Sequence, residues 1–216
     1  MTTSDPTSES TRRPTGEPKG DFVSALVGHA EDQRLVTLRN RLADQADETG
    51  VLDVAYRTID TPVGELLIAA TERGLVRVAY AVEGHETVLS TIAAQISPRV
   101  LRAPARLDDA ARELEEYFTG RRRAFDLPLD MRLARGFRRV VLEHLREIAY
   151  GATASYGVVA TAAGKPAAVR AVGTACAKNP LPVVVPCHRV VRSDGAVGQY
   201  VGGPAAKQAL ITLEAA

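Results

Sequence analysis

The apolar and polar positions along the chain fall into four patterns. Residues 1–20 hold no large apolar side chain after Met1 and are rich in Ser, Thr, Pro and charge. Such a segment buries too little surface to offset the entropy of ordering, which predicts a disordered tail. Over residues 21–50, leucines recur at helical spacings among charged residues, which predicts a helical extension that packs on the domain following it. Its role stays open. The patterns of residues 51–130 and 131–216 predict two folded domains.

The first of these domains has the pattern of a small sheet followed by helices. Residues 52–81 alternate apolar and polar side chains and are interrupted by the turn sequences PVG (62–64) and ERG (72–74). Alternation with a period of two is typical of half-buried strands, and this predicts an antiparallel sheet of about three strands. Residues 85–96 and 107–118 then repeat apolar positions at helical spacing. The second of these helices begins with two aspartates, which suit the positive end of a helix dipole.

The second domain is predicted to be helical. Residues 136–151 place their apolar side chains on one side of a helix. A short helix over about 156–163, a Gly-Lys-Pro turn (164–166) and a second, alanine-rich helix over about 166–177 then form a helix-turn-helix pattern. The predicted fold class is therefore α/β (α+β), with a small N-terminal antiparallel-sheet domain and a C-terminal domain that carries the helix-turn-helix.

Charge is distributed unevenly over the chain, although the formal net charge is only +1. From Met131 onward there are 11 Lys and Arg against 4 Asp and Glu, while the rest of the chain carries 16 against 22. A basic domain suits a polyanionic partner, because its cations neutralise phosphates and release counterions. The alternative is solvated surface charge. The second helix of the pattern also sets small residues around a single cation, Arg170, which suits close approach to DNA or, alternatively, tight packing in a core.

Composition indicates the cellular compartment and excludes several classes of protein. The two cysteines are too few for a disulfide framework or a four-thiolate metal site. No apolar signal segment opens the chain, and no apolar run approaches the roughly 20 residues of a membrane helix. We therefore expect a cytoplasmic protein with free thiols, no metal and no membrane association.

Cys187 is the candidate for chemistry. It stands in the sequence NPLPVVVPCHRVV (179–191), beside a histidine and an arginine. A thiol needs a nearby base or positive charge to become a nucleophilic thiolate, and His188 is adjacent in sequence. Neighbours on an extended segment point in opposite directions, so contact between the two side chains does not follow from adjacency. A buried inert thiol remains the alternative for Cys187, and for Cys176 it is the favoured interpretation.

Several short motifs together resemble one known family. PCHRVV (186–191) follows NPLPVVV (179–185) and precedes GQYVGG (198–203), while SYG (155–157) and RAVG (170–173) lie in the helix-turn-helix. This arrangement resembles the O6-alkylguanine-DNA alkyltransferases, also called methylated-DNA–protein-cysteine methyltransferases. The resemblance implies a ribonuclease H-like N-terminal domain and direct repair of DNA. A thiolate cannot reach the O6 atom of a stacked guanine, so the base must be flipped out of the duplex.

The resemblance assigns a role to four residues of the reaction centre. Cys187 matches the alkyl acceptor, and His188 matches a general base that works through water. Glu214 is implied to orient the imidazole and to stabilise its charged form, in the manner of a triad. Asn179 matches an asparagine that ties the turn before the acceptor segment to the helix-turn-helix.

The resemblance also implies a guanine pocket and a DNA surface. The pocket residues are Tyr156, Val190, Tyr200, Val201 and Gly202, with Lys207 supporting their loop. The DNA-binding residues are Arg170, Ala171, Tyr156 and Lys178. Arg170 would fill the vacated place in the base stack while its smooth alanine-rich helix enters the minor groove.

The implied partner is double-stranded DNA containing O6-alkylguanine, with O4-alkylthymine as a further substrate. No cofactor is implied, and a monomer is expected. Because a thioether is not hydrolysed by water, each molecule would act once. Two other functions remain as alternatives: a lesion-recognition protein that flips bases without chemistry, and a cysteine hydrolase built from Cys187, His188 and Glu214.

Overall fold

The computed structural model describes residues 34–39, 41–43, 45–46 and 49–216. The predicted tail and most of the predicted helical extension lie outside these residues. Contacts divide the chain into residues 1–39 and 40–216, and the architecture below is that of the second unit.

In the described part of the extension, residues 34–39, 41–43 and 45–46 are helical and residues 49–50 form a turn. The residues of the extension from 40 onward belong to the second unit. Among them, Leu42 is 57% exposed, whereas Ala43 and Ala46 are buried with Leu52 in the main core. In this unit, two alanines rather than the leucine therefore pack in the core.

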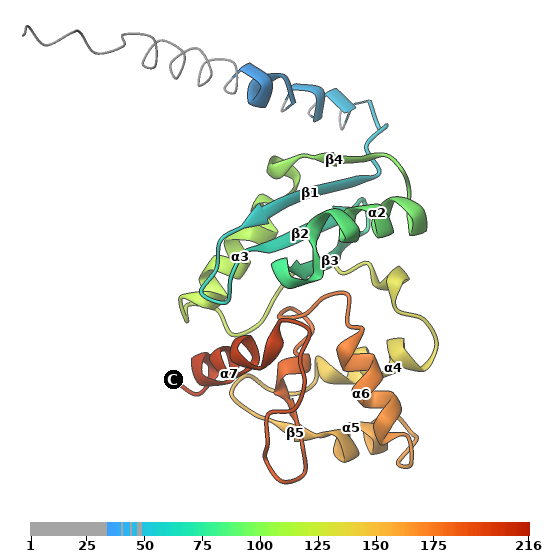
Figure 1. The fold of residues 1–216 in the computed structure, drawn as a ribbon, viewed down its shortest axis with the longest axis vertical. Coiled ribbons are helices and arrows are strands. Elements are labelled where there is room, and N and C mark those ends of the chain that lie inside the picture. The colour runs from blue at the N-terminus through green and yellow to red at the C-terminus, as the bar shows by residue number, and fades with distance from the viewer. Residues whose placement is uncertain (1–33, 40, 44, 47–48) are drawn as a thin grey trace, which may run out of the picture. The chain divides into compact units, whose positions relative to one another are not determined.

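The N-terminal sheet has four strands in the order β3-β2-β1-β4. Strands β1 (Val54–Ile59), β2 (Leu66–Thr71) and β3 (Gly74–Tyr80) form the antiparallel meander that the sequence predicts. Strand β4 (Val100–Arg102) was not predicted; it pairs in parallel with β1 (Figure 1). Its three residues are too few to show an alternating pattern.

Two helices cover the faces of this sheet. Helix α2 (His85–Gln95) contributes Val88 and Ile92 to an apolar cluster on one face, and helix α3 (Asp108–Phe118) packs Leu114 on the other (Figure 1). Both helices lie within one residue of the predicted ranges. Strand β2 (LLIAAT) is buried on both faces, which explains why its first five residues are all apolar.

The C-terminal half contains four helices: α4 (Phe137–Leu145), α5 (Tyr156–Ala162), α6 (Val169–Ala177) and α7 (Gly203–Glu214). The two-residue strands β5 (Ala154–Ser155) and β6 (Val190–Val191) pair in parallel. Short 3-10 helices lie at Ala81–Glu83, Pro104–Leu107, Met131–Leu133 and Cys187–Arg189. No described helix is long and apolar enough to cross a membrane.

Two of the predicted helices are shorter than expected. Helix α4 ends at Leu145 rather than near residue 151, where Gly151 adopts φ 75°. A side chain at Gly151 would come within 2.8 Å of the Glu214 carbonyl oxygen, so a glycine is required there. Helix α6 begins at Val169 rather than at residue 166, because Lys165 and Ala168 close a separate turn with a 2.8 Å hydrogen bond.

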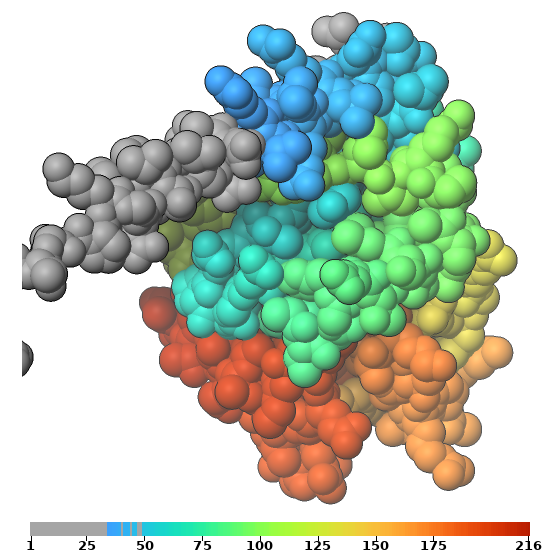
Figure 2. All heavy atoms as spheres, turned by 45° about the horizontal axis from the view of Figure 1, so that its top comes forward, coloured from blue at the N-terminus to red at the C-terminus, as the bar shows by residue number. Residues whose placement is uncertain are grey.

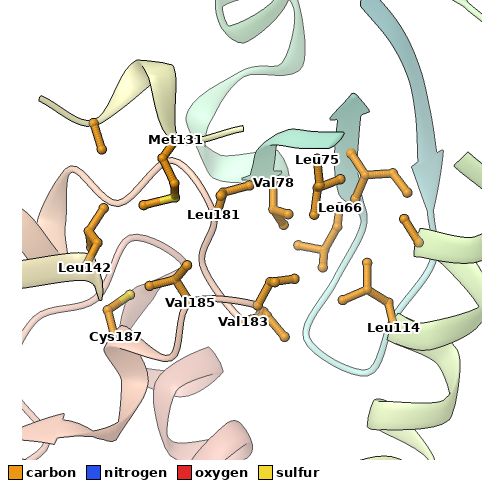
Figure 3. Packing of buried hydrophobic residues seen from close by; sticks show 14 of the residues in the cluster. Leu66, Leu75, Val78, Leu114, Met131, Leu142, Leu181, Val183, Val185 and Cys187 are labelled. Carbon is orange, nitrogen blue, oxygen red and sulfur yellow. The ribbon is translucent and has the colours of Figure 1, made fainter. Parts of the chain in front are cut away.

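One apolar core contains residues from both sides of the predicted domain boundary at residue 130. The segment Leu181–Val185 packs between the sheet residues and the helices that surround Cys187 (Figure 3). On the face drawn in Figure 2, the N-terminal half (teal to green) and the C-terminal half (orange to red) meet without a gap. Each buried valine or leucine of the segment contributes about 1.5–3 kcal/mol relative to an exposed one. The site described below therefore lies against the sheet.

Backbone hydrogen bonds cover the free edge of β3. Leu75 donates to Pro128 and accepts from Asp130, both at 2.8 Å, and Val78 donates to Pro180 at 2.8 Å. An uncovered strand edge leaves donors and acceptors without partners, so these bonds complete the sheet and fix the position of the turn at residues 179–180.

Candidate active site

The acceptor segment approaches Cys187 through a strained backbone. Val183 adopts φ 73°, and it is the one non-glycine residue in the described parts of the chain with a positive φ. For a β-branched residue this conformation is a genuine outlier, and such strain persists only where surrounding structure enforces it. Here Val183 is buried and Asn179 ties the two ends of the turn together. The strain therefore lies four residues before the candidate nucleophile, within the turn that Asn179 closes.

Asn179 holds both the turn and the sulfur of Cys187. Its Nδ2 donates to the Val185 carbonyl at 2.9 Å and to Cys187 Sγ at 3.1 Å, and its Oδ1 accepts from Leu181 N–H at 2.9 Å. The asparagine is 1% exposed, so these contacts satisfy a buried amide. A donor directed at sulfur favours the thiolate over the thiol.

Cys187 is a protonated thiol in this resting arrangement. It is 1% exposed, and burial raises the pKa of its thiol to about 11 even though the Asn179 hydrogen bond and the Lys207 charge lower it. A base is therefore required before the sulfur can act as a nucleophile.

The imidazole of His188 is oriented to serve as that base. Its Nε2 lies 2.9 Å from Glu214 Oε1, so we assign the ring proton to Nε2, as donor to the carboxylate. Nδ1 then carries a lone pair; it is buried and has no hydrogen-bond partner in the described protein. Burial lowers the pKa of His188 and outweighs the opposing effect of Glu214, so the imidazole is neutral near pH 7.

Glu214 is ionised because several donors surround it. Arg189 binds it through Nε at 2.8 Å and Nη2 at 2.9 Å, Tyr117 Oη donates at 2.6 Å, and Gly151 N–H donates at 3.3 Å. Burial alone would raise the pKa of this carboxyl, but the hydrogen bonds from His188 and Arg189 hold it well below its usual range. Burial raises the pKa of Tyr117, which therefore stays a donor.

Sequence reasoning did not find Tyr117 and Arg189. Arg189 stands inside the PCHRVV motif, and a buried carboxylate such as Glu214 needs a cation that can bind both of its oxygens. The sequence therefore contained a signal for Arg189. Tyr117 lies on α3 in the N-terminal half, 97 residues from Glu214, and only the fold brings the two together.

Four of the residues predicted to line a pocket, Tyr156, Val190, Tyr200 and Val201, belong to or pack against the same apolar cluster as Cys187. Tyr200 presents its ring edge-on to His188, with 6.4 Å between centroids, and it packs with Val201 on the cluster that contains Cys187 and Val190. The hydroxyl of Tyr156 lies against Gly198, where an added Cβ would be 3.2 Å away. We call residues 198–202 the pocket loop.

Lys207 fixes the position of this loop. Its Nζ is fully buried and donates to the carbonyls of Val190, at 2.6 Å, and Val197. It lies 6.0 Å from the centre of the Tyr156 ring. Burial lowers the pKa of Lys207, and its positive charge in turn lowers the pKa of Cys187.

Three of the predicted DNA-binding residues are exposed, whereas the fourth, Tyr156, is partly buried beside Gly198. Arg170 and Ala171 on α6, and Lys178 directly after it, are exposed, whereas Val172, Ala175 and Cys176 face the core. Helix α6 thus packs one side of its small residues inward and presents Arg170 outward. Within the described residues, no three His, Cys, Asp or Glu side chains gather closely enough to hold a metal ion.

Comparisons with known proteins identify the relatives of this chain. Residues 136–216 match the model of the 6-O-methylguanine DNA methyltransferase DNA-binding domain, and residues 54–131 match the ribonuclease-like domain of the same protein. A methylated-DNA–protein-cysteine methyltransferase of Methanosarcina barkeri is 36% identical over 159 residues, which are 74% of this chain and 96% of the relative. The chain belongs to the 6-O-methylguanine DNA methyltransferase family.

Further members of this methyltransferase family agree in sequence and fold. The constitutive enzyme of Bacillus subtilis is 39% identical over 151 residues, covering 68% of this chain and 86% of the relative. The crystal structure of Mycobacterium tuberculosis OGT in complex with DNA has 36% identity and a TM-score of 0.63, covering 74% of this chain and 92% of the other. The α/β fold class is confirmed by these structural neighbours.

Proposed function

We propose that the protein repairs O6-alkylguanine in double-stranded DNA by transferring the alkyl group to Cys187. The observation that carries the proposal is the buried sulfur beside a histidine whose Nε2 is held by an ionised carboxylate. Membership of a methyltransferase family and a match to a structure containing DNA support it. We propose O4-alkylthymine as a further substrate.

DNA enters this proposal through α6. Its exposed side carries Arg170 and Ala171, and small residues let a helix approach a groove closely. Arg170 would occupy the space left in the base stack by the flipped nucleotide, and Lys178 would contact a phosphate. Tyr156, at the start of α5, would contact the extrahelical base. We propose a cytoplasmic monomer in which residues 51–130 form the supporting domain and residues 131–216 carry DNA binding and chemistry.

Deprotonation of Cys187 is the first chemical step. Because burial raises the pKa of Cys187 to about 11, the thiol is protonated at pH 7. His188 Nδ1 would accept the thiol proton through one water molecule. Glu214 stabilises the imidazolium that results, and because Arg189 and Tyr117 already bind the carboxylate, it does not take the proton itself. Asn179 donates to the developing thiolate.

The bonds and protons of the alkyl transfer are all accounted for without a cofactor. The sulfur attacks the alkyl carbon, a carbon–sulfur bond forms, and the bond from that carbon to O6 breaks. The departing guanine takes up one proton, which replaces the proton lost from Cys187, so guanine is restored in the DNA. The Tyr156 hydroxyl, whose pKa is raised by burial, would donate a hydrogen bond to the leaving base. The thioether persists, and each protein molecule reacts once.

A stoichiometric repair assay tests this function. Duplex oligonucleotides bearing one O6-methylguanine are mixed with increasing protein, and the remaining O6-methylguanine is measured by mass spectrometry of the digested DNA. We expect lesion loss equal to the protein added, with guanine appearing in its place. Repeated turnover would favour hydrolase chemistry, and tight lesion binding without loss of the methyl group would favour a recognition protein; either result contradicts the proposal.

A further inference from the structure

Tyr80, the last residue of β3, contacts the pocket loop from the N-terminal sheet. Its side chain is 3% exposed, and its hydroxyl oxygen lies 3.1 Å from that of Tyr200. The two rings pack edge to face with centroids 5.7 Å apart. Tyr80 therefore joins a strand outside the motif-bearing region to a residue of the proposed pocket.

The ring of Tyr80 also presses against Gly202. A Cβ added at Gly202 would lie 2.6 Å from both Cε1 and Cζ of Tyr80. Gly202 has φ −82°, a conformation open to any residue, so the backbone does not require glycine. The neighbouring aromatic ring is what excludes a side chain there.

The backbone of Tyr80 is hydrogen-bonded to a group that is linked to the Asn179 turn. Its N–H donates to Glu83 Oε1 at 2.9 Å, Glu83 pairs with Arg77, and Arg77 Nη1 donates to the Asn179 carbonyl at 3.4 Å. Strand β3 thus fixes two sides of the surroundings of Cys187, the turn that begins at Asn179 and the pocket loop.

The two tyrosine hydroxyls lie within electrostatic reach of the sulfur. Burial raises the pKa of both Tyr80 and Tyr200, and ionisation of Cys187 would raise each pKa further. Both hydroxyls are therefore protonated at neutral pH. A shift of the Tyr80 ring would move Gly202 and Tyr200, and with them the wall beside Cys187.

We propose that Tyr80 is a positioning residue that determines how much space the pocket loop leaves beside Cys187, and so which alkyl groups fit. The ring sets the position of Gly202, and the hydroxyl sets that of Tyr200. The selectivity for alkyl groups rests on the proposed function, whereas the control of space beside the thiol does not.

The first test measures access to the thiol and needs no alkylguanine. Wild type, Tyr80→Phe and Tyr80→Leu are treated with iodoacetamide at fixed pH, and labelling of Cys187 and Cys176 is followed by peptide mass spectrometry. Cys176 is the internal control, because it is buried on α6. We expect the Cys187/Cys176 rate ratio to rise about threefold in Tyr80→Phe, which loses one hydrogen bond, and about tenfold in Tyr80→Leu.

An unchanged ratio in both variants would overturn the proposal, and so would a parallel rise at both cysteines, which indicates general loosening. Tyr80→Phe keeps the ring and the core volume, so it carries the comparison even where Tyr80→Leu does not fold.

A double-mutant cycle tests the ring contact itself. Gly202→Ala places a methyl group against Tyr80, and we expect it to displace the loop and change the Cys187 labelling rate by about tenfold. Combined with Tyr80→Leu, which removes the ring edge, the same alanine should change the rate by less than about twofold. Additive effects of the two substitutions would contradict the contact.

Alkyl selectivity is the third readout. Duplexes carrying O6-methylguanine or O6-benzylguanine are reacted in single-turnover conditions with wild type and Tyr80→Leu. We expect the benzyl-to-methyl rate ratio to rise about tenfold in the variant, and an unchanged ratio contradicts this role. If wild type transfers neither group, the proposed function is wrong while the labelling result still decides the role of Tyr80.

Discussion

The surroundings of the two cysteines show what separates a reactive thiol from a packed one. Cys176 is 6% exposed and Cys187 1%, and burial raises the pKa of both. Asn179 donates to the Cys187 sulfur, and the adjacent His188 is held by Glu214. No hydrogen bond reaches the Cys176 sulfur from the described residues. Burial is thus common to both cysteines, whereas polar groups surround Cys187.

The largest expected difference comes from replacing each thiol in turn. Cys187→Ser should abolish methyl transfer, because no other described thiol has these surroundings. Cys176→Ser should leave the single-turnover rate within about twofold of wild type, since the hydroxyl is close in size to the thiol. Rates are measured with duplex O6-methylguanine. Loss of transfer in a folded Cys176→Ser protein would remove the distinction between the two thiols.

Removing the charge beside His188 should have the next largest effect. Glu214→Gln keeps the size of the side chain but cannot stabilise an imidazolium, so we expect transfer to slow by about 10²- to 10³-fold. DNA affinity, measured by fluorescence anisotropy, should change little. Equal losses in transfer and affinity would contradict the role of Glu214.

Glu113→Gln is the matched control for this change. Glu113 is also a buried carboxylate; it accepts from Asp126 N–H at 2.9 Å and lies 3.4 Å from Arg122. It contacts neither His188 nor Cys187 among the described interactions. Its replacement should leave the transfer rate within about twofold.

Asn179→Ala should make Cys187 more like Cys176. The sulfur loses its donor, so its pKa should rise further above the ordinary thiol value and transfer should slow by about tenfold. The Leu181 N–H and Val185 carbonyl also lose a buried partner, which should cost about 1–3 kcal/mol of unfolding free energy. Thiolate absorbance against pH and urea unfolding measure the two effects. An unchanged thiol pKa would mean that this hydrogen bond does not tune the sulfur.

The smallest effect is expected from Tyr117→Phe, and it is a shift in pH dependence. Tyr117 donates to Glu214, so its loss makes the carboxylate a stronger acceptor for His188. The pKa of His188, which burial lowers, should then rise. Since the base works when neutral, the acidic limb of the pH–rate profile should move to higher pH, with little change at its plateau. A uniform drop in rate at all pH values would instead indicate a merely structural role.

The sequence carried more information about local elements than about the contacts between them. Helices α2 and α3, the three-stranded meander and the helix-turn-helix follow from periodicity because each is repeated over several turns or strand residues. Strand β4 could not be predicted from periodicity, because its three residues show no pattern and its pairing with β1 joins distant segments.

In the candidate active site, too, the sequence predicted residues near the motif but not the contacts from distant parts of the chain. The motif around Cys187 pointed to His188, Asn179 and Glu214 through resemblance. The structure contains the expected contact between His188 and Glu214, whereas the hydrogen bond from Asn179 to the Cys187 sulfur was not predicted. The contribution of the N-terminal half was not predicted: Tyr117 reaches Glu214 and Tyr80 reaches the pocket loop only because the sheet packs on the C-terminal half. Neither tyrosine stands in a motif or periodic pattern that indicates such a contact.

The most direct test of the account is to locate the methyl group after reaction. Wild-type protein is incubated with excess duplex O6-methylguanine and digested, and the methyl content of the Cys187 and Cys176 peptides is quantified by mass spectrometry. We expect one methyl group per chain, all of it on Cys187. Methyl groups shared with Cys176, or found elsewhere with Cys187 unmodified, would contradict it.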